Sequence, residues 1–88
     1  FDNPKDLMKR SEDEIRNSDI LLIDMTNKTT GRAIEAGMAY SLSKKIIVIM
    51  KKDTKIKDTT KGIADVIIEY STIEDILIKL KDILREWQ

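Results

Sequence analysis

The chain has 88 residues, enough for one small domain that buries roughly 60% of the surface its unfolded chain exposes. Its 16 basic and 16 acidic residues give a formal net charge of zero, so no global positive field attracts a nucleic acid polymer or an anionic membrane. The chain has neither Cys nor His, which excludes disulfides, thiolate nucleophiles, Cys/His metal sites and histidine-based triads. Acid–base chemistry must therefore use carboxylates, Lys or Tyr.

No segment approaches the ~20 apolar residues of a membrane span, and no signal peptide is visible. A reducing cytoplasm is therefore the expected compartment. The chain begins with Phe1 rather than Met, as expected of a processed or excised piece. We interpret residues 1–88 as a single, partial domain.

The first predicted element is a helix that starts at Asp2-Asn3-Pro4, because Asn3 can cap and Pro4 suits the first helical position. It is expected to run to about Asn17, although its apolar face is sparse. Three short apolar runs without alternation predict parallel strands covered on both faces. These runs are Ile20–Ile23, Ile46–Met50 and Val66–Ile68.

Residues Thr29–Ser43 predict a glycine-tipped turn leading into a helix. Apolar and small residues cover most of its circumference at about 100° per residue, which is typical of a helix buried nearly all round. Glu35 falls among the apolar positions of this helix. A carboxylate there is either unusually placed or has a function.

The polar segment Lys51–Lys61 predicts a solvated loop that ends at Gly62. Ser71-Thr72-Ile73-Glu74 then predicts a capping box ahead of an amphipathic helix. The apolar positions of that last helix are Ile73, Ile76, Leu77, Leu80, Ile83, Leu84 and Trp87. The order of elements (helix, strand, helix, strand, loop, strand, helix) predicts an α/β fold.

Ligands of open parallel sheets bind at the carboxyl ends of the strands. The segment that leaves the first strand there and enters the next helix offers polar groups and free N–H groups that favour an anion. Its members Thr29 and Thr30 are equally explained as helix caps. In the segment Lys51–Lys61, the hydroxyls of Thr59 and Thr60 either contact a phosphate or belong to plain loop residues. The binding candidates are Asp24, Thr26, Thr29, Thr30, Gly31, Thr59 and Thr60.

Glu35 has two interpretations from the residues alone. It is either an acidic residue that the positive end of a helix favours, or a nucleophile or general base in a pocket of small residues. Asp19 precedes its strand and is expected to be structural. Tyr40 and Tyr70 are expected at the edge of the core or in an interface, and Trp87 in the core or a dimer contact.

Three stretches together resemble the nucleoside 2-deoxyribosyltransferase family, which includes the 2'-deoxynucleoside 5'-phosphate N-hydrolases. They are Ser18–Thr26, the helix start Gly31-x-x-x-Glu35-x-Gly37-x-Ala39, and Lys44-x-Ile46. The similarity continues through Gly62-Ile63-Ala64-Asp65 and the last helix. The resemblance implies a flavodoxin-like or Rossmann-like three-layer fold with a parallel sheet.

The resemblance also implies that Glu35 is a nucleophile that attacks the anomeric carbon of a 2'-deoxyribose and expels the base. The sugar then passes to water or to another base. Transferases of this family carry an Asp where this chain has Thr29, and a hydroxyl there is closer to the phosphate-binding loop of the hydrolases. Thr59 or Thr60 could correspond to a second hydroxyl of that loop.

Three further departures from the family pattern stand out. The hydrolases carry an Asp at the place of Ser11, for which Asp13 could substitute only with a register shift. Lys45 replaces a proline. The opening strand of the family, with its aromatic residue and Gly-rich turn, has no match, so the N-terminal strand region is expected to be absent from this chain. An unpaired sheet edge would favour dimerisation.

The resulting hypothesis is cleavage of the N-glycosidic bond of 2'-deoxynucleosides or their 5'-monophosphates, without a cofactor or metal, by a homo-oligomer. The alternative is a catalytically inactive nucleotide-binding or interaction module of the same fold. A receiver-type domain is a third interpretation, but its acidic phosphoacceptor cluster is not evident.

Overall fold

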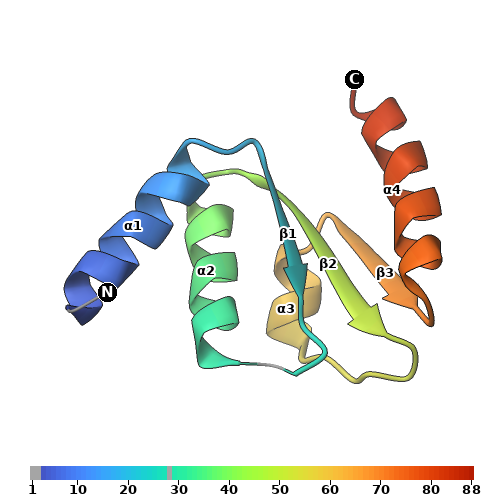
Figure 1. The fold of residues 1–88 in the computed structure, drawn as a ribbon, viewed down its shortest axis with the longest axis horizontal. Coiled ribbons are helices and arrows are strands. Elements are labelled where there is room, and N and C mark those ends of the chain that lie inside the picture. Colours follow the sequence, from blue (N-terminus) through green and yellow to red (C-terminus); the bar gives the residue numbers. More distant parts are fainter. Residues whose placement is uncertain (1–2, 28) are drawn as a thin grey trace.

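The computed structural model describes residues 3–27 and 29–88 and has an α/β fold (Figure 1). Three parallel strands form one sheet, which helices flank, in an arrangement consistent with a flavodoxin-like fold. The fold class expected from the sequence is therefore confirmed. In chain order the elements are α1 (Pro4–Arg16), β1 (Ile20–Asp24), α2 (Thr30–Ser41), β2 (Lys45–Lys51), α3 (Asp58–Ile63), β3 (Val66–Tyr70) and α4 (Ile73–Glu86).

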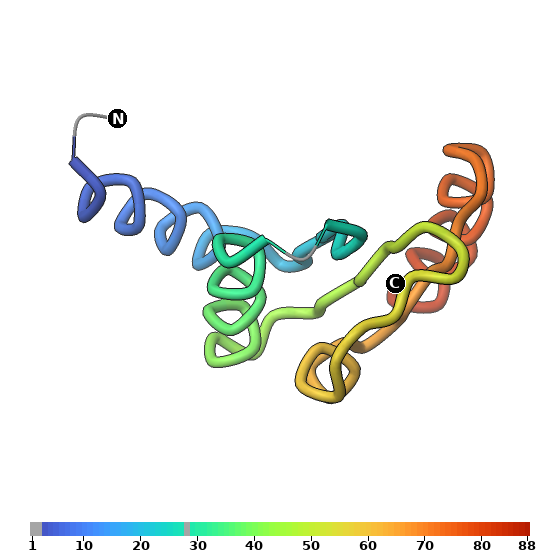
Figure 2. Tube along the Cα trace, turned by 90° about the horizontal axis from the view of Figure 1, so that it is seen from below, coloured from blue at the N-terminus to red at the C-terminus, as the bar shows by residue number. Residues whose placement is uncertain are grey.

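The sheet has the order β1-β2-β3, so β2 is central and β1 and β3 are the edge strands. Helices α2 and α3 lie on one face of the sheet and α4 lies on the other, which Figure 2 shows clearly. Helix α1 packs against α2 and lies beyond β1 (Figure 1). The first element along the chain is thus a helix rather than a strand, as expected.

The core lies between β1, β2 and α2, and small residues of α2 let the helix approach the sheet. Ala39 and Ile46 are fully buried, and Ile15 brings the end of α1 into the same cluster. The buried members of the cluster are Ile15, Ile23, Met25, Ala36, Ala39, Ile46 and Val48.

The prediction that all three strands are covered on both faces is correct only for β2. In β1 the side chain of Leu22 is 47% exposed, and in β3 Ile67 is 38% exposed. For Leu22 the reason is that α4 contacts mainly β3, so the α4 face of β1 has no helix over it. Ile67 is paired in register with the core residue Val48, so it lies on the α2 face of the sheet, at the edge strand β3. An apolar run therefore marked the strands correctly, but it did not show how many helices cover them.

The prediction that α2 is buried nearly all round is wrong. Only Ala36 and Ala39 are buried, whereas Ile34 is 45% exposed and Tyr40 is 60% exposed. One edge of α2 faces the sheet and its flanks face α1 and α3, so the outer side stays in solvent. Tyr40 therefore lies at the surface of the part of the chain that the structure describes.

Gly31 is the second residue of α2, so the expected glycine-tipped turn is also wrong. Its φ is not positive, and a Cβ at this position would meet nothing within 4 Å. Neither backbone conformation nor packing among the described residues requires a glycine at this position.

The segment Lys51–Lys61, expected to be a loop, begins with the last residue of β2 and contains the start of the short helix α3, which spans residues 58–63. Ile56 and Ile63 pack against the core cluster and hold α3 on the sheet, although Lys57 provides no side-chain cap. Apolar anchors at both ends of a polar segment thus outweigh its weak helix propensity.

The capping box of α4 is one residue later than predicted, since it joins Thr72 to Asp75. Asp75 Oδ2 accepts hydrogen bonds from the Ser71 N–H at 2.9 Å and the Thr72 N–H at 3.1 Å. These two bonds hold the pKa of Asp75 below its ordinary value. The start of α4 is therefore fixed against the end of β3.

Asp65 secures the amino end of the central strand. Its Oδ2 accepts the N–H of Ile46 at 2.8 Å, and its own N–H donates to the Ile46 carbonyl at 2.9 Å. Asp19, expected to be structural, is exposed and uses its backbone carbonyl to accept the N–H of Lys45 at 3.2 Å.

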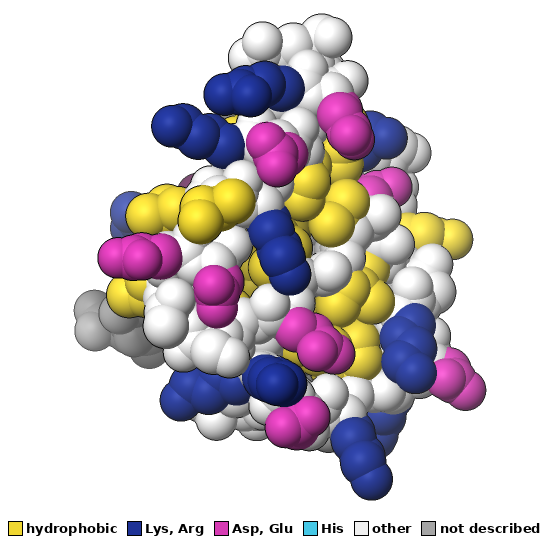
Figure 3. Space-filling view, turned by 90° about the vertical axis from the view of Figure 1, so that its right-hand side faces the viewer, with side chains coloured by type: hydrophobic (Ala, Val, Ile, Leu, Met, Phe, Trp, Pro, Cys, Tyr) yellow, Lys and Arg dark blue, Asp and Glu magenta, His cyan; other side chains and the backbone are white. Residues whose placement is uncertain are grey.

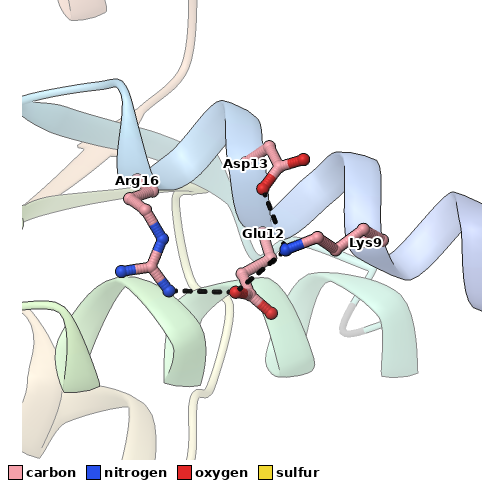
Figure 4. Close-up of polar contacts among 4 residues, drawn as sticks. All are labelled: Lys9, Glu12, Asp13 and Arg16. Carbon is pink, nitrogen blue, oxygen red and sulfur yellow. Dashed lines mark hydrogen bonds and ion pairs between the residues drawn. The ribbon is translucent and has the colours of Figure 1, made fainter.

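Helix α1 is stabilised on its surface by ion pairs at helical spacing (Figure 4). Lys9 Nζ lies 3.3 Å from Asp13 Oδ1, and Arg16 Nη2 lies 2.9 Å from Glu12 Oε1. Each exposed pair contributes a few tenths of a kcal/mol. These pairs, together with the Asn3 cap, support a helix whose apolar face is sparse.

Candidate active site

The Glu35 side chain is half-buried in the middle of α2, facing α1 rather than the carboxyl ends of the strands. It lines a pocket of about 240 Å³ that α1, α2 and the first residues of β1 enclose. We call this space the Glu35 pocket. Its lining residues are Ser11, Glu14, Ile15, Ser18, Ile20, Leu21, Glu35 and Lys44.

The Glu35 pocket combines two carboxylates, two hydroxyls and one ammonium group with three apolar side chains. Glu14 is already engaged, because Arg10 Nε donates to its Oε1 at 3.1 Å. Ser18 is engaged as well, since its hydroxyl donates to the Glu14 carbonyl at 2.7 Å. Within residues 3–27 and 29–88, the Glu35 carboxylate accepts no hydrogen bond and forms no ion pair. It is thus the carboxylate of this pocket that remains available to a ligand.

The sequence did not indicate Glu14, Ser18 or Lys44 as neighbours of Glu35. A signal existed, because residues 11, 14 or 15, and 18 recur at the spacing of one helix face. Ser11, at the place where the hydrolases carry an Asp, does face the Glu35 pocket. Asp13 does not line it and instead contacts Lys9 (Figure 4).

A second polar cluster joins the carboxyl ends of all three strands. The Asp24 carboxylate accepts the Thr26 hydroxyl at 2.6 Å and N–H at 2.9 Å on Oδ1, and the Tyr70 hydroxyl at 2.7 Å on Oδ2. The Thr26 hydroxyl in turn accepts the N–H of Lys51 at 3.0 Å. The two binding candidates Asp24 and Thr26 therefore hold β1, β2 and β3 together and do not lie in the Glu35 pocket.

The electrostatics of Asp24 follow from these contacts. Partial burial by itself raises the pKa of Asp24. This effect of burial is outweighed by hydrogen bonds from the Thr26 hydroxyl, the Thr26 N–H and the Tyr70 hydroxyl, and by the charge of Arg32. Together they hold the pKa of Asp24 below its ordinary value. The ionised form is therefore the one that the fold stabilises.

This lowered pKa predicts an acid-sensitive contribution to stability. Because the folded-state pKa lies below the unfolded value of ~3.9, the contribution is complete above that value and is lost as pH falls through the folded-state pKa. Urea unfolding of the protein and of Asp24→Asn at several pH values should show a free-energy difference at neutral pH that shrinks in acid. A difference that stays constant from neutral pH to pH ~2 would contradict the assignment.

The remaining binding candidates lie elsewhere. Thr29 caps α2, and its hydroxyl accepts the N–H of Arg32 at 3.4 Å, while Thr30 and Gly31 are exposed in the first turn. Thr59 and Thr60 line a separate pocket of about 240 Å³ between α2 and α3, together with Met25, Ala33, Ile56 and Lys57. The structure thus places the candidate nucleophile and the candidate phosphate-binding hydroxyls in two different pockets.

No group of three or more acidic side chains capable of holding a metal ion occurs in the part of the chain that the structure describes. None of the helices in that part has the length and apolar character needed to cross a bilayer.

The parallel sheet and the helices on both of its faces define a flavodoxin-like α/β domain, and a half-buried carboxylate of α2 lines one of its pockets. Among solved structures, the chain is similar to the CMP N-glycosidase BcmB of Clostridium botulinum, with a TM-score of 0.78 and 25% sequence identity. The match covers 89% of this chain and 74% of that chain.

BcmB is a member of the nucleoside 2-deoxyribosyltransferase-like family, so the resemblance expected from the sequence is confirmed. No family model matches the chain. No curated protein matches it in sequence.

Proposed function

We propose that this protein cleaves the N-glycosidic bond of nucleosides or nucleoside 5'-monophosphates, with 2'-deoxynucleosides and their 5'-monophosphates as expected substrates. The observation that carries the proposal is the half-buried Glu35 carboxylate of α2, which has no partner among the described residues, in a fold shared with an N-glycosidase. Because the similar protein BcmB is named a CMP N-glycosidase, pyrimidine ribonucleotides are further candidate substrates. We also propose that residues 1–88 are part of a nucleoside deoxyribosyltransferase-like domain.

The proposed reaction is a double displacement. A Glu35 oxygen attacks the anomeric carbon, the bond from that carbon to the base nitrogen breaks, and the base leaves with the bonding electrons and takes up a proton. Water or a second base then attacks the same carbon and releases the Glu35 carboxylate. The apolar side chains around Glu35, among them Ile15 and Ile20, limit hydration of the carboxylate and so increase its reactivity.

We further propose that a 5'-phosphate binds near the carboxyl ends of the strands. Supporting this, Thr59 and Thr60 line the pocket beside the first turns of α2, where backbone N–H groups favour an anion. Thr29, with a hydroxyl in place of the transferase Asp, favours hydrolysis over transfer.

The test is base release from a panel of CMP, dCMP, dGMP, dAMP and the matching nucleosides, followed by liquid chromatography. We expect free base and a sugar phosphate in equal amounts from at least one nucleotide. If the protein is a transferase, addition of a second base to the reaction should yield a new nucleotide. Absence of base release from every member of the panel would refute the enzymatic proposal.

One observation favours the alternative of an inactive nucleotide-binding module: Glu35 and Thr59 lie in separate pockets. Such a module would bind a nucleotide in calorimetry and release no base. The same panel, measured for binding and for cleavage on one preparation, distinguishes the two functions.

A further inference from the structure

A pocket of about 370 Å³ lies between the C-terminal end of α4 and the first residues of β1 and β2. Helix α4 runs antiparallel to the strands, so this end of the helix reaches the amino ends of the strands, away from Asp24 (Figure 1). The side of the molecule that α4 and β3 form exposes apolar side chains between charged ones (Figure 3). We call this space the Trp87 pocket. Its lining residues are Asp19, Ile20, Lys45, Leu84, Trp87 and Gln88.

The strand register places the two strand residues of the Trp87 pocket on one face of the sheet. Ile20 and Lys45 are paired in register, and each precedes a residue that packs in the core on the α2 side, Leu21 and Ile46 respectively. Because successive side chains of a strand point to opposite faces, Ile20 and Lys45 point to the α4 side. Lys45 Nζ accordingly lies 5.5 Å from the centre of the Trp87 ring.

The polar groups of the Trp87 pocket are available to a ligand. In the part of the chain that the structure describes, the Asp19 carboxylate accepts no hydrogen bond and forms no ion pair, and the indole N–H of Trp87 donates to no residue. Ile20 is half-buried beside them, and Leu84 is 40% exposed. The pocket therefore offers an acceptor, two donors and an aromatic ring next to apolar side chains.

The contact between Lys45 and Trp87 is one that a ligand can replace. Lys45 is exposed, and a cation–π contact contributes little at an exposed site. Stacking of a nucleobase on an aromatic side chain contributes more. A flat ring can therefore take the place of the ammonium over Trp87, while the flexible Lys45 side chain moves to the edge of that ring and donates to it.

The charged groups select the kind of ring that fits. Asp19 requires a hydrogen-bond donor and Lys45 requires an acceptor on the same flat molecule. Cytosine and adenine supply both, because each carries an amino group beside a ring nitrogen acceptor, and carboxylates are known partners of the cytosine amino group. Uracil has a carbonyl oxygen in place of that amino group, and a carboxylate repels it. The charges of Asp19 and Lys45 cancel, which favours an uncharged ligand.

We propose that the Trp87 pocket binds a free nucleobase that carries an exocyclic amino group. The base stacks on Trp87, its amino group donates to Asp19, and Lys45 donates to a ring acceptor. Ile20 also lines the Glu35 pocket, so the two pockets are neighbours that share one side chain. The proposal does not depend on the proposed reaction, although a free base is what that reaction would release.

Trp87 provides a direct readout, because it is the single Trp of the chain. In an isotope-labelled sample it gives one indole N–H signal in the NMR spectrum. Addition of cytosine should shift this signal along a curve that saturates in the millimolar range. Uracil should bind more weakly by about fivefold or more, since it cannot donate to Asp19.

Three variants locate the bound base. Asp19→Asn keeps the size of the side chain, but its amide can accept from cytosine or donate to uracil, so the preference for cytosine should fall to about onefold. The matched control Asp82→Asn makes the same change at an exposed carboxylate of α4 outside the Trp87 pocket and should keep the preference. Glu35→Gln should leave both dissociation constants unchanged. The remaining NMR signals of each variant verify that it is folded.

A Trp87 signal that does not shift, or that shifts without saturation at tens of millimolar cytosine, overturns the proposal. Equal affinity for cytosine and uracil overturns it too, as does a preference that Asp19→Asn leaves unchanged. Loss of the shift in Glu35→Gln would place the base in the Glu35 pocket instead. None of these results depends on base release, so this proposal and the proposed function fail separately.

Discussion

Replacement of Glu35 by Gln is expected to lower the rate of base release by about 10³-fold or more, because the amide cannot form the glycosyl ester. The side chain keeps its size and its place among the apolar groups of the Glu35 pocket. Nucleotide binding should therefore change much less than turnover. The measurement is base release under single-turnover conditions together with a binding constant from calorimetry.

Glu69→Gln is the matched control, since Glu69 is an exposed carboxylate of β3 that lines neither the Glu35 pocket nor the pocket of Thr59 and Thr60. It should keep full activity. Thermal unfolding of both variants verifies that each is folded. Wild-type base release in Glu35→Gln would show that another group or a bound water attacks the sugar, even if the protein is an N-glycosidase.

The intermediate gives a direct test of the role assigned to Glu35. Rapid acid quench of a reaction with excess substrate should leave a fraction of the protein heavier by the mass of the sugar or sugar phosphate, with the adduct on the peptide that contains Glu35. Base release without any adduct under these conditions would favour a single displacement by water.

Ile46→Ala is expected to destabilise the fold by about 2–5 kcal/mol, because it removes three buried carbons from the fully enclosed centre of the core. Small domains have a free energy of unfolding of only about 5–15 kcal/mol, so a large share of the stability would be lost. Urea unfolding followed by circular dichroism measures the change.

Ile78→Ala makes the same chemical change at a side chain that is 64% exposed on α4 and should cost less than about 1 kcal/mol. Equal effects of the two substitutions would mean that the core is not centred on β2 and α2. The comparison also separates folding from activity, because neither residue lines the Glu35 pocket.

The Glu35 pocket depends on the core through α1. Ile15 is 6% exposed in the core cluster and also lines the pocket, so it anchors the helix that supplies Ser11 and Glu14. The ion pairs of α1 stabilise the helix itself but do not attach it to the rest of the protein. Packing of Ile15 therefore links the stability of the fold to the shape of the candidate site.

The sequence by itself determined the fold class and the elements other than the short helix α3. Continuous apolar runs marked the three strands, the caps Asn3 and Thr29 lie at the starts of α1 and α2, and the order of elements gave a parallel α/β fold. The motif around Gly31 and Glu35 was sufficient to indicate the family resemblance. These features depend on residues close together in the chain, so local patterns are enough to predict them.

Only the tertiary structure decided which surfaces are covered and which side chains meet. It showed that α2 is buried along one edge, that α4 covers only part of the sheet, and that Asp24 joins three strands through Tyr70. It also placed Glu35 beside Ser11 and apart from Thr59. The physical reason is that burial and contact depend on how distant segments pack, and the same apolar residue fits a covered face or an open one until its neighbours are in place.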